Sequence, residues 1–131
     1  MDIKKMLVND RVKPYLLKAR YGIEKESNRV DLSGNLAKTD HPKSIRDEHP
    51  YIQRDFSETQ MELITPVTET LEELFNYLAA IHDVAYRSMG DHEMLWPLSM
   101  PPQLPEKEED IVIAKLKNVE NVLYRQSLSN S

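Results

Sequence analysis

One stretch of this chain carries a sustained helical repeat, which is the clearest structural pattern in the sequence. Apolar side chains recur every three or four residues along residues 70–89. Thr70 followed three residues later by Glu73 fits a capping box, with Thr68 as an alternative cap, and Gly90 suits the position just after a helix end. We therefore predict a helix near residues 70–89. Its apolar positions are Leu71, Leu74, Phe75, Leu78, Ile81, Ala85 and Met89.

The chain before this helix changes from a helical to an extended pattern. Residues 2–19 have a helical pattern, and Pro14 within them predicts a kink or two short helices, because proline removes a helical hydrogen bond. Residues 31–35, Asp-Leu-Ser-Gly-Asn, have turn composition between two extended runs, which favours a β-hairpin. Residues 51–56 and 60–65 alternate as two further strands would, and in the second the alternation places Glu62 and Ile64 on one face with Met61 and Leu63 on the other.

Shorter segments complete the predicted fold. Residues 40–50 are charged and contain prolines, which is typical of a loop. Residues 93–102 contain three prolines, so they should be extended and irregular. Residues 111–114 begin either a strand or a helix, and residues 118–128 have the pattern of a last helix. This order of elements predicts an α+β fold, an antiparallel sheet with packed helices, in a single domain over residues 1–131.

Composition narrows the classes of function. With 17 Lys and Arg against 22 Asp and Glu, the net charge is −5, which argues against a general nucleic-acid binder. The chain has no cysteine, so it forms neither a disulfide nor a thiolate metal site. It has no signal-peptide core and no run of about 20 apolar residues that would span a membrane, so we expect a cytoplasmic protein. Its 3 glycines are too widely spaced for a phosphate-binding loop, so any nucleotide would be held through carboxylates and a metal ion.

The distribution of acidic residues is the most informative feature for function. Glu24, Glu26, Asp55, Glu58 and Glu62 all fall in predicted strands or at strand ends, where acids are depleted. If the first of these strands lies beside the two that follow, up to four carboxylates converge. Such a cluster repels itself unless protons or divalent cations compensate it. Mg²⁺ is the natural candidate, because it prefers oxygen ligands and is often shared between carboxylates and phosphates.

A plainer interpretation is that these acids form an exposed face of the sheet. They would then pair with the neighbouring cations Lys25, Arg29 and Arg54. Glu58 fits this interpretation best, because it falls in the predicted turn between two strands and turn residues are usually exposed. The pattern by itself leaves both interpretations open.

Three long blocks of the sequence carry a family resemblance. RYGIEKESNRVD begins at Arg20, DFSETQMELITP at Asp55 and RSMGDHEMLWPLSMPP at Arg87. In that order they resemble the N-terminal part of bacterial glutamate–cysteine ligase, and most of all the ligase module of bifunctional glutathione-synthesising proteins. The resemblance extends from about Met6 to Leu128, where YRQSL is similar to the next family segment.

The resemblance implies a catalytic fold akin to that of glutamine synthetase, in which an antiparallel sheet curves around the active site. It implies ATP-dependent joining of the γ-carboxylate of L-glutamate to the amino group of L-cysteine through an acyl phosphate, the first step of glutathione synthesis, with Mg²⁺ beside the phosphates. The family's acidic metal ligands fall on Glu24, Glu26, Asp55 and Glu62, and an aromatic residue of its cysteine pocket falls on Phe56. The resemblance assigns no direct catalytic step to a residue of this chain.

The sequence departs from the family pattern in two places. Asn28 replaces an apolar residue, and after Leu128 the chain has Ser-Asn-Ser where the family continues into a much longer catalytic domain. We therefore expect an N-terminal fragment that is inactive alone and whose partner is the missing remainder of the ligase. The alternatives are a non-enzymatic metal-binding or interaction module, one half of a split enzyme, or a truncated product with an exposed sheet edge.

Overall fold

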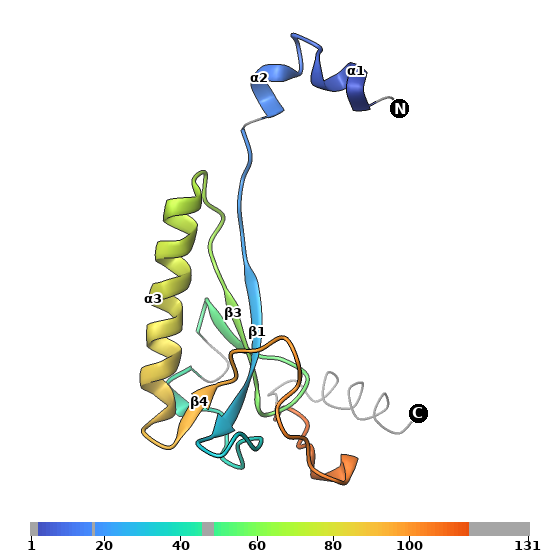
Figure 1. Cartoon of the computed structure of the whole chain (residues 1–131). Helices are drawn as coiled ribbons and strands as arrows, with labels where there is room; N and C mark the ends of the chain where they lie inside the picture. The colour runs from blue at the N-terminus through green and yellow to red at the C-terminus, as the bar shows by residue number, and fades with distance from the viewer. Residues whose placement is uncertain (1–2, 17, 46–48, 116–131) are drawn as a thin grey trace.

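A four-stranded antiparallel sheet forms the centre of the protein (Figure 1). The computed structural model describes residues 3–16, 18–45 and 49–115. The strands, in the order β2-β3-β1-β4 across the sheet, are β1 (Glu24–Asp31), β2 (Ile52–Arg54), β3 (Gln60–Ile64) and β4 (Glu93–Leu95). β1 is central, because its first part pairs with β3 and its last part with β4. The predicted α+β fold with an antiparallel sheet is confirmed.

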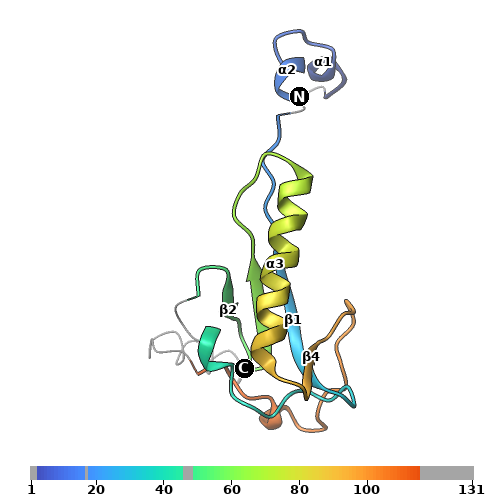
Figure 2. The same ribbon diagram turned by 90° about the vertical axis from the view of Figure 1, so that its left-hand side faces the viewer.

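The helix α3 (Leu71–Met89) lies along one face of this sheet, as Figure 2 shows. The hydroxyl of Thr70 accepts a hydrogen bond from the amide of Glu73 at 3.2 Å, which satisfies one free donor of the first turn. Gly90 follows the last turn with a φ of 79°, which glycine adopts without strain. The predicted helix and its cap are therefore confirmed. Between helix and sheet lies a core of Ile45, Ile52, Met61, Leu63, Ile81, Ala85 and Leu95.

The predicted apolar stripe of α3 is only partly buried. Leu74, Ile81 and Ala85 are buried against the sheet. Leu71 and Phe75, on the neighbouring flank of the helix, remain 53% and 58% exposed. Because burial of a large apolar side chain contributes roughly 1.5–3 kcal/mol, the inner row of the stripe accounts for most of the stabilisation that α3 provides here.

The predicted hairpin at residues 31–35 forms its turn but not its second strand. The carboxylate of Asp31 accepts hydrogen bonds from two backbone amides of the turn, at 2.8 and 3.0 Å. The chain then returns to β1 through an isolated bridge at Leu36. A longer second strand is blocked because β3 already occupies this edge of β1, where the amide of Arg29 donates to the carbonyl of Thr59 at 2.7 Å.

The ends of the described chain follow the predicted pattern less closely. The expected break near Pro14 appears as two short helices, α1 (Ile3–Leu7) and α2 (Lys13–Leu16), which lie beyond one end of the sheet in Figure 1. Two single turns of 3-10 helix, η1 (Lys43–Ile45) and η2 (Glu108–Asp110), lie in the connections. The predicted helix over 118–128 falls outside the described residues. Within the ranges that are described, no helix has the length and apolar character needed to cross a bilayer.

Candidate metal and substrate site

Two acidic side chains face each other across the centre of the sheet. The pairing register places Glu26 of β1 directly opposite Glu62 of β3, and Gln53 of β2 lies opposite Glu62 on the other side. Residues directly opposite in antiparallel strands share a face, with Cβ atoms about 4.5–5.5 Å apart. The neighbours of Glu62 in β3, Met61 and Leu63, are buried in the core beneath α3. The facing carboxylates therefore lie on the face of the sheet that α3 leaves uncovered.

The other two predicted metal ligands flank this pair. Glu24 lies two residues before Glu26 and so shares its face of β1. Asp55 follows β2 directly, and its amide lies 3.5 Å from the carbonyl of Gln60. Glu24 and Glu26 are exposed, whereas Asp55 and Glu62 are half-buried. In the part of the chain that the structure describes, no three acidic, histidine or cysteine side chains are close enough to enclose a metal ion. The structure thus brings Glu26 and Glu62 together and leaves Glu24 and Asp55 beside them.

The three cations that could have paired with these acids on an exposed face of the sheet lie instead on the opposite face. The register places Lys25, Arg29 and Arg54 on the side of the sheet that holds the apolar core. There Arg29 forms an ion pair with Glu93 at 2.7 Å, and Arg54 forms one with Glu58 at 3.3 Å. The sheet therefore separates these three cations from the facing carboxylates.

Glu58 lies inside the protein, which corrects the expectation that it is exposed. Glu58 is only 3% exposed. Its carboxylate accepts hydrogen bonds from the amides of His41 and Lys115, at 2.9 and 2.8 Å, and from Arg54 at 3.3 Å. Burial raises the pKa of Glu58, but these donors outweigh burial and hold the pKa below its ordinary value. Turn composition did not predict this, because both amides come from distant parts of the chain.

A second set of buried charges adjoins Glu58. Arg29 is 0% exposed, and its guanidinium donates to Glu93, to the hydroxyl and carbonyl of Thr39 at 2.8 Å each, and to the carbonyl of Glu58 at 3.1 Å. Burial and two neighbouring arginine charges lower the pKa of His41 to about 4, so its ring is neutral at neutral pH. Sequence reasoning missed this network, because no local pattern links residues so far apart along the chain.

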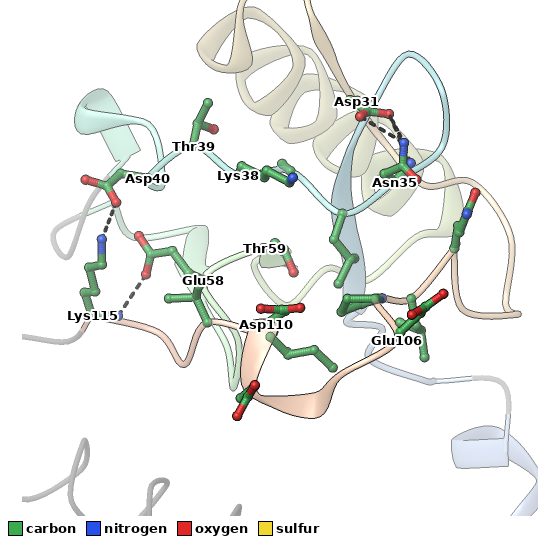
Figure 3. Close-up of a pocket in the computed structure, with 18 residues that line it drawn as sticks. Asp31, Asn35, Lys38, Thr39, Asp40, Glu58, Thr59, Glu106, Asp110 and Lys115 are labelled. Atoms are coloured by element: carbon green, nitrogen blue, oxygen red, sulfur yellow. Dashed lines mark hydrogen bonds and ion pairs between the residues drawn. The ribbon is translucent and has the colours of Figure 1, made fainter.

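An open groove of about 780 Å³ runs beside Glu58 (Figure 3). At its edge Asp40 and Lys115 form an ion pair, and Figure 3 shows Glu58 and Asp40 both directed toward Lys115. The other labelled lining residues are Asp31, Asn35, Lys38, Thr39, Thr59, Glu106 and Asp110. Glu26 and Glu62 do not line this groove, so it is separate from the facing carboxylates.

Comparison with known proteins identifies the family. A family model described as glutamate-cysteine ligase matches residues 4–131. The chain belongs to the glutamate–cysteine ligase family. It is 54% identical to the glutathione biosynthesis bifunctional protein GshAB of Enterococcus faecalis, in a match that covers 98% of this chain and 17% of that protein. The protein of the same name from Clostridium perfringens is 47% identical, in a match that covers 95% of this chain and 16% of that protein.

Solved structures agree with this assignment. The fold of this family member resembles a bifunctional glutathione synthetase from Pasteurella multocida with a TM-score of 0.81 and 41% identity, covering 97% of this chain and 16% of that chain. It resembles a glutamate–cysteine ligase from Francisella tularensis, solved in complex with AMP, with a TM-score of 0.77 and 30% identity, covering 85% of this chain and 23% of that chain. The resemblance found in the sequence is confirmed, and the chain spans only a small part of the length of these relatives.

Proposed function

We propose that this chain supplies one wall of the nucleotide, metal and substrate site of an ATP-dependent glutamate–cysteine ligase. Membership of the family supports the reaction, and the AMP in the complex of the Francisella relative supports a nucleotide site. The observation that carries the metal assignment is the direct opposition of Glu26 and Glu62 on the uncovered face of the sheet. A ligase that consumes ATP, L-glutamate and L-cysteine works where these substrates are supplied, so we propose a cytoplasmic location.

The donor chemistry of this face suits Mg²⁺. Carboxylate oxygens are the ligands that Mg²⁺ prefers, and one or two carboxylates commonly hold it together with substrate phosphates. Glu26 and Glu62 repel each other across the sheet, and a dication between them would offset that repulsion. Glu24 and Asp55, on either side of the pair, are the remaining proposed ligands. When bound, the metal ion would neutralise the negative charge on the phosphate oxygens while the phosphoryl group is transferred.

The proposed reaction has two steps, and this wall of the site would help to align the reactants in both. An oxygen of the glutamate γ-carboxylate attacks the γ-phosphorus of ATP, and ADP leaves. The cysteine amine then attacks the acyl carbon, the bond to the phosphate oxygen breaks, and the nitrogen loses a proton to give the amide. The acidic face would orient the phosphates, and the half-buried Phe56 would contact the cysteine side chain. One open face does not enclose three substrates, so we propose that the isolated chain has negligible activity.

A coupled assay of ADP release with glutamate and cysteine tests the proposal. In a complete ligase that contains this sequence, Glu24→Ala and Glu62→Ala should each abolish turnover without loss of folding, because each removes a carboxylate from the metal face. Glu69→Ala, at an exposed position just before α3, is the matched control and should retain activity.

Three outcomes would contradict parts of the proposal. Full activity in both Glu24→Ala and Glu62→Ala would refute the site. Turnover by the isolated 131-residue chain at the rate of an ordinary ligase would refute the proposal that it has negligible activity alone. Metal binding by the chain, combined with no turnover when the rest of a ligase is supplied, would favour a non-enzymatic metal-binding module.

A further inference from the structure

The connection between β2 and β3 carries two of the proposed site residues, Asp55 and Phe56. Loops of this kind are usually mobile, but this one is held from outside its own hairpin. The amide of Ala114 donates to the carbonyl of Phe56 at 3.1 Å, and the amide of Glu58 donates to the carbonyl of Val112 at 2.8 Å. A distant segment of the chain therefore lies against the connection and restrains it.

Glu58 is the point at which these restraints meet. Its amide donates a hydrogen bond to Val112, and its carbonyl accepts one from Arg29. Its carboxylate accepts hydrogen bonds from His41, Lys115 and Arg54. A single side chain thereby joins the connection to three other parts of the fold. Because the three donors converge on one buried carboxylate, they specify one position for the backbone of the connection.

This arrangement does more to select a conformation than to add stability. A buried ion pair gains little net stability, because removing the charges from water costs about as much as their attraction returns. The pair formed by Arg29 and Glu93 is similarly buried, with the two side chains 1% and 8% exposed. Arg29 also donates to the carbonyl of Glu58, but its acidic partner Glu93 lies in β4 rather than in the connection. The acids of the two pairs thus differ in what they position rather than in how deeply they are buried.

We infer that Glu58 is a positioning residue, which holds the connection between β2 and β3 so that Asp55 and Phe56 face the site. The inference rests on the proposed function, because Asp55 and Phe56 matter only if they bind metal and substrate. In Glu58→Gln, an amide NH₂ group replaces one acceptor oxygen and meets a donor, so at least one of the three contacts is lost. The connection then moves while the rest of the sheet keeps its pairing.

The test compares Glu58→Gln with Glu93→Gln in the 131-residue chain. The measurements are the affinity for Mn²⁺ by electron paramagnetic resonance, the melting temperature, and the amide resonances of Asp55 and Phe56 by NMR. Both variants should melt at a lower temperature than the wild type. Only Glu58→Gln should shift the two amide resonances and weaken Mn²⁺ binding, by about tenfold. Glu58→Asp keeps the charge with a shorter side chain and should give a smaller loss, so it serves if Glu58→Gln does not fold.

Two results would overturn the inference. One is wild-type Mn²⁺ affinity with unmoved Asp55 and Phe56 resonances in the Glu58 variants, and the other is an equal loss of affinity in Glu93→Gln. If the wild-type chain binds no Mn²⁺, the proposed metal site fails instead. In that case the resonances of Asp55 and Phe56 still decide whether Glu58 positions the connection.

Discussion

Replacing Glu26 by Gln should make the metal-free protein more stable and its metal binding weaker. Glu26 and Glu62 lie directly opposite each other, and two like charges about 5 Å apart in water repel by about 0.8 kcal/mol. Measured cross-strand pairs contribute roughly 0.2–1 kcal/mol, which agrees in size. Because Glu26 is exposed and Gln has nearly the same shape, we expect the free energy of unfolding to rise by about 0.5–1 kcal/mol. For a domain of this size that corresponds to a rise in Tm of about 3 °C.

The assay is urea and thermal unfolding in the presence of a chelator at low salt. The gain should disappear at about 1 M salt, where the screening length is about 3 Å. Glu24→Gln is the matched control, because Glu24 lies opposite Ile64 and its removal relieves no facing charge. Both variants should bind Mn²⁺ about tenfold more weakly than the wild type. A destabilised Glu26→Gln would refute the repulsion, and unchanged Mn²⁺ affinity in both variants would refute their role as ligands.

Two further predictions concern the helix cap and the buried histidine. Thr70→Ala should lower the free energy of unfolding by about 1 kcal/mol, whereas Thr70→Ser should not, since only alanine loses the acceptor for the amide of Glu73; thermal melts check this. The folded pKa of His41 is about 4, below its ordinary 6.5, so the unfolded chain takes up this proton first and stability should fall as pH falls from about 6.5 to about 4. Urea unfolding at several pH values in this range should show that the free energy of unfolding depends less on pH in His41→Asn than in the wild type, whereas replacement of the exposed His92 by Asn should leave that dependence unchanged. An unchanged pH dependence in His41→Asn would contradict a buried neutral ring.

Local patterns predicted α3, the strands β2 and β3 and the faces of β3, but not the missing second strand after the turn at residues 31–35. The alternation of Met61 and Leu63 with Glu62 predicted that the acid and the apolar residues lie on opposite faces, and β3 confirms this. The opposition of Glu26 and Glu62 was beyond such reasoning, because the register between two strands depends on contacts that are distant in sequence. The sequence could therefore indicate candidate ligands but not which two of them meet.

Glu58 shows the corresponding limit for a turn. A polar residue between two short strands is expected to be exposed, and the local sequence contains no sign to the contrary. Its burial depends on the chain near Val112 returning to the turn and on two arginines reaching it from β1 and β2. The residue that we infer to position the site was for this reason the one that sequence reasoning valued least.

The proposed metal site on the acidic face of the sheet can be located by NMR. Mn²⁺ added in small amounts to isotope-labelled protein broadens the amide resonances of the residues that lie near the ion. If the ion binds on the acidic face, the amides of Glu26 and Glu62 should broaden first, ahead of those of Glu106 and Asp110 in the groove of Figure 3. Broadening that begins at Glu106 and Asp110 and spares Glu26 and Glu62 would contradict it.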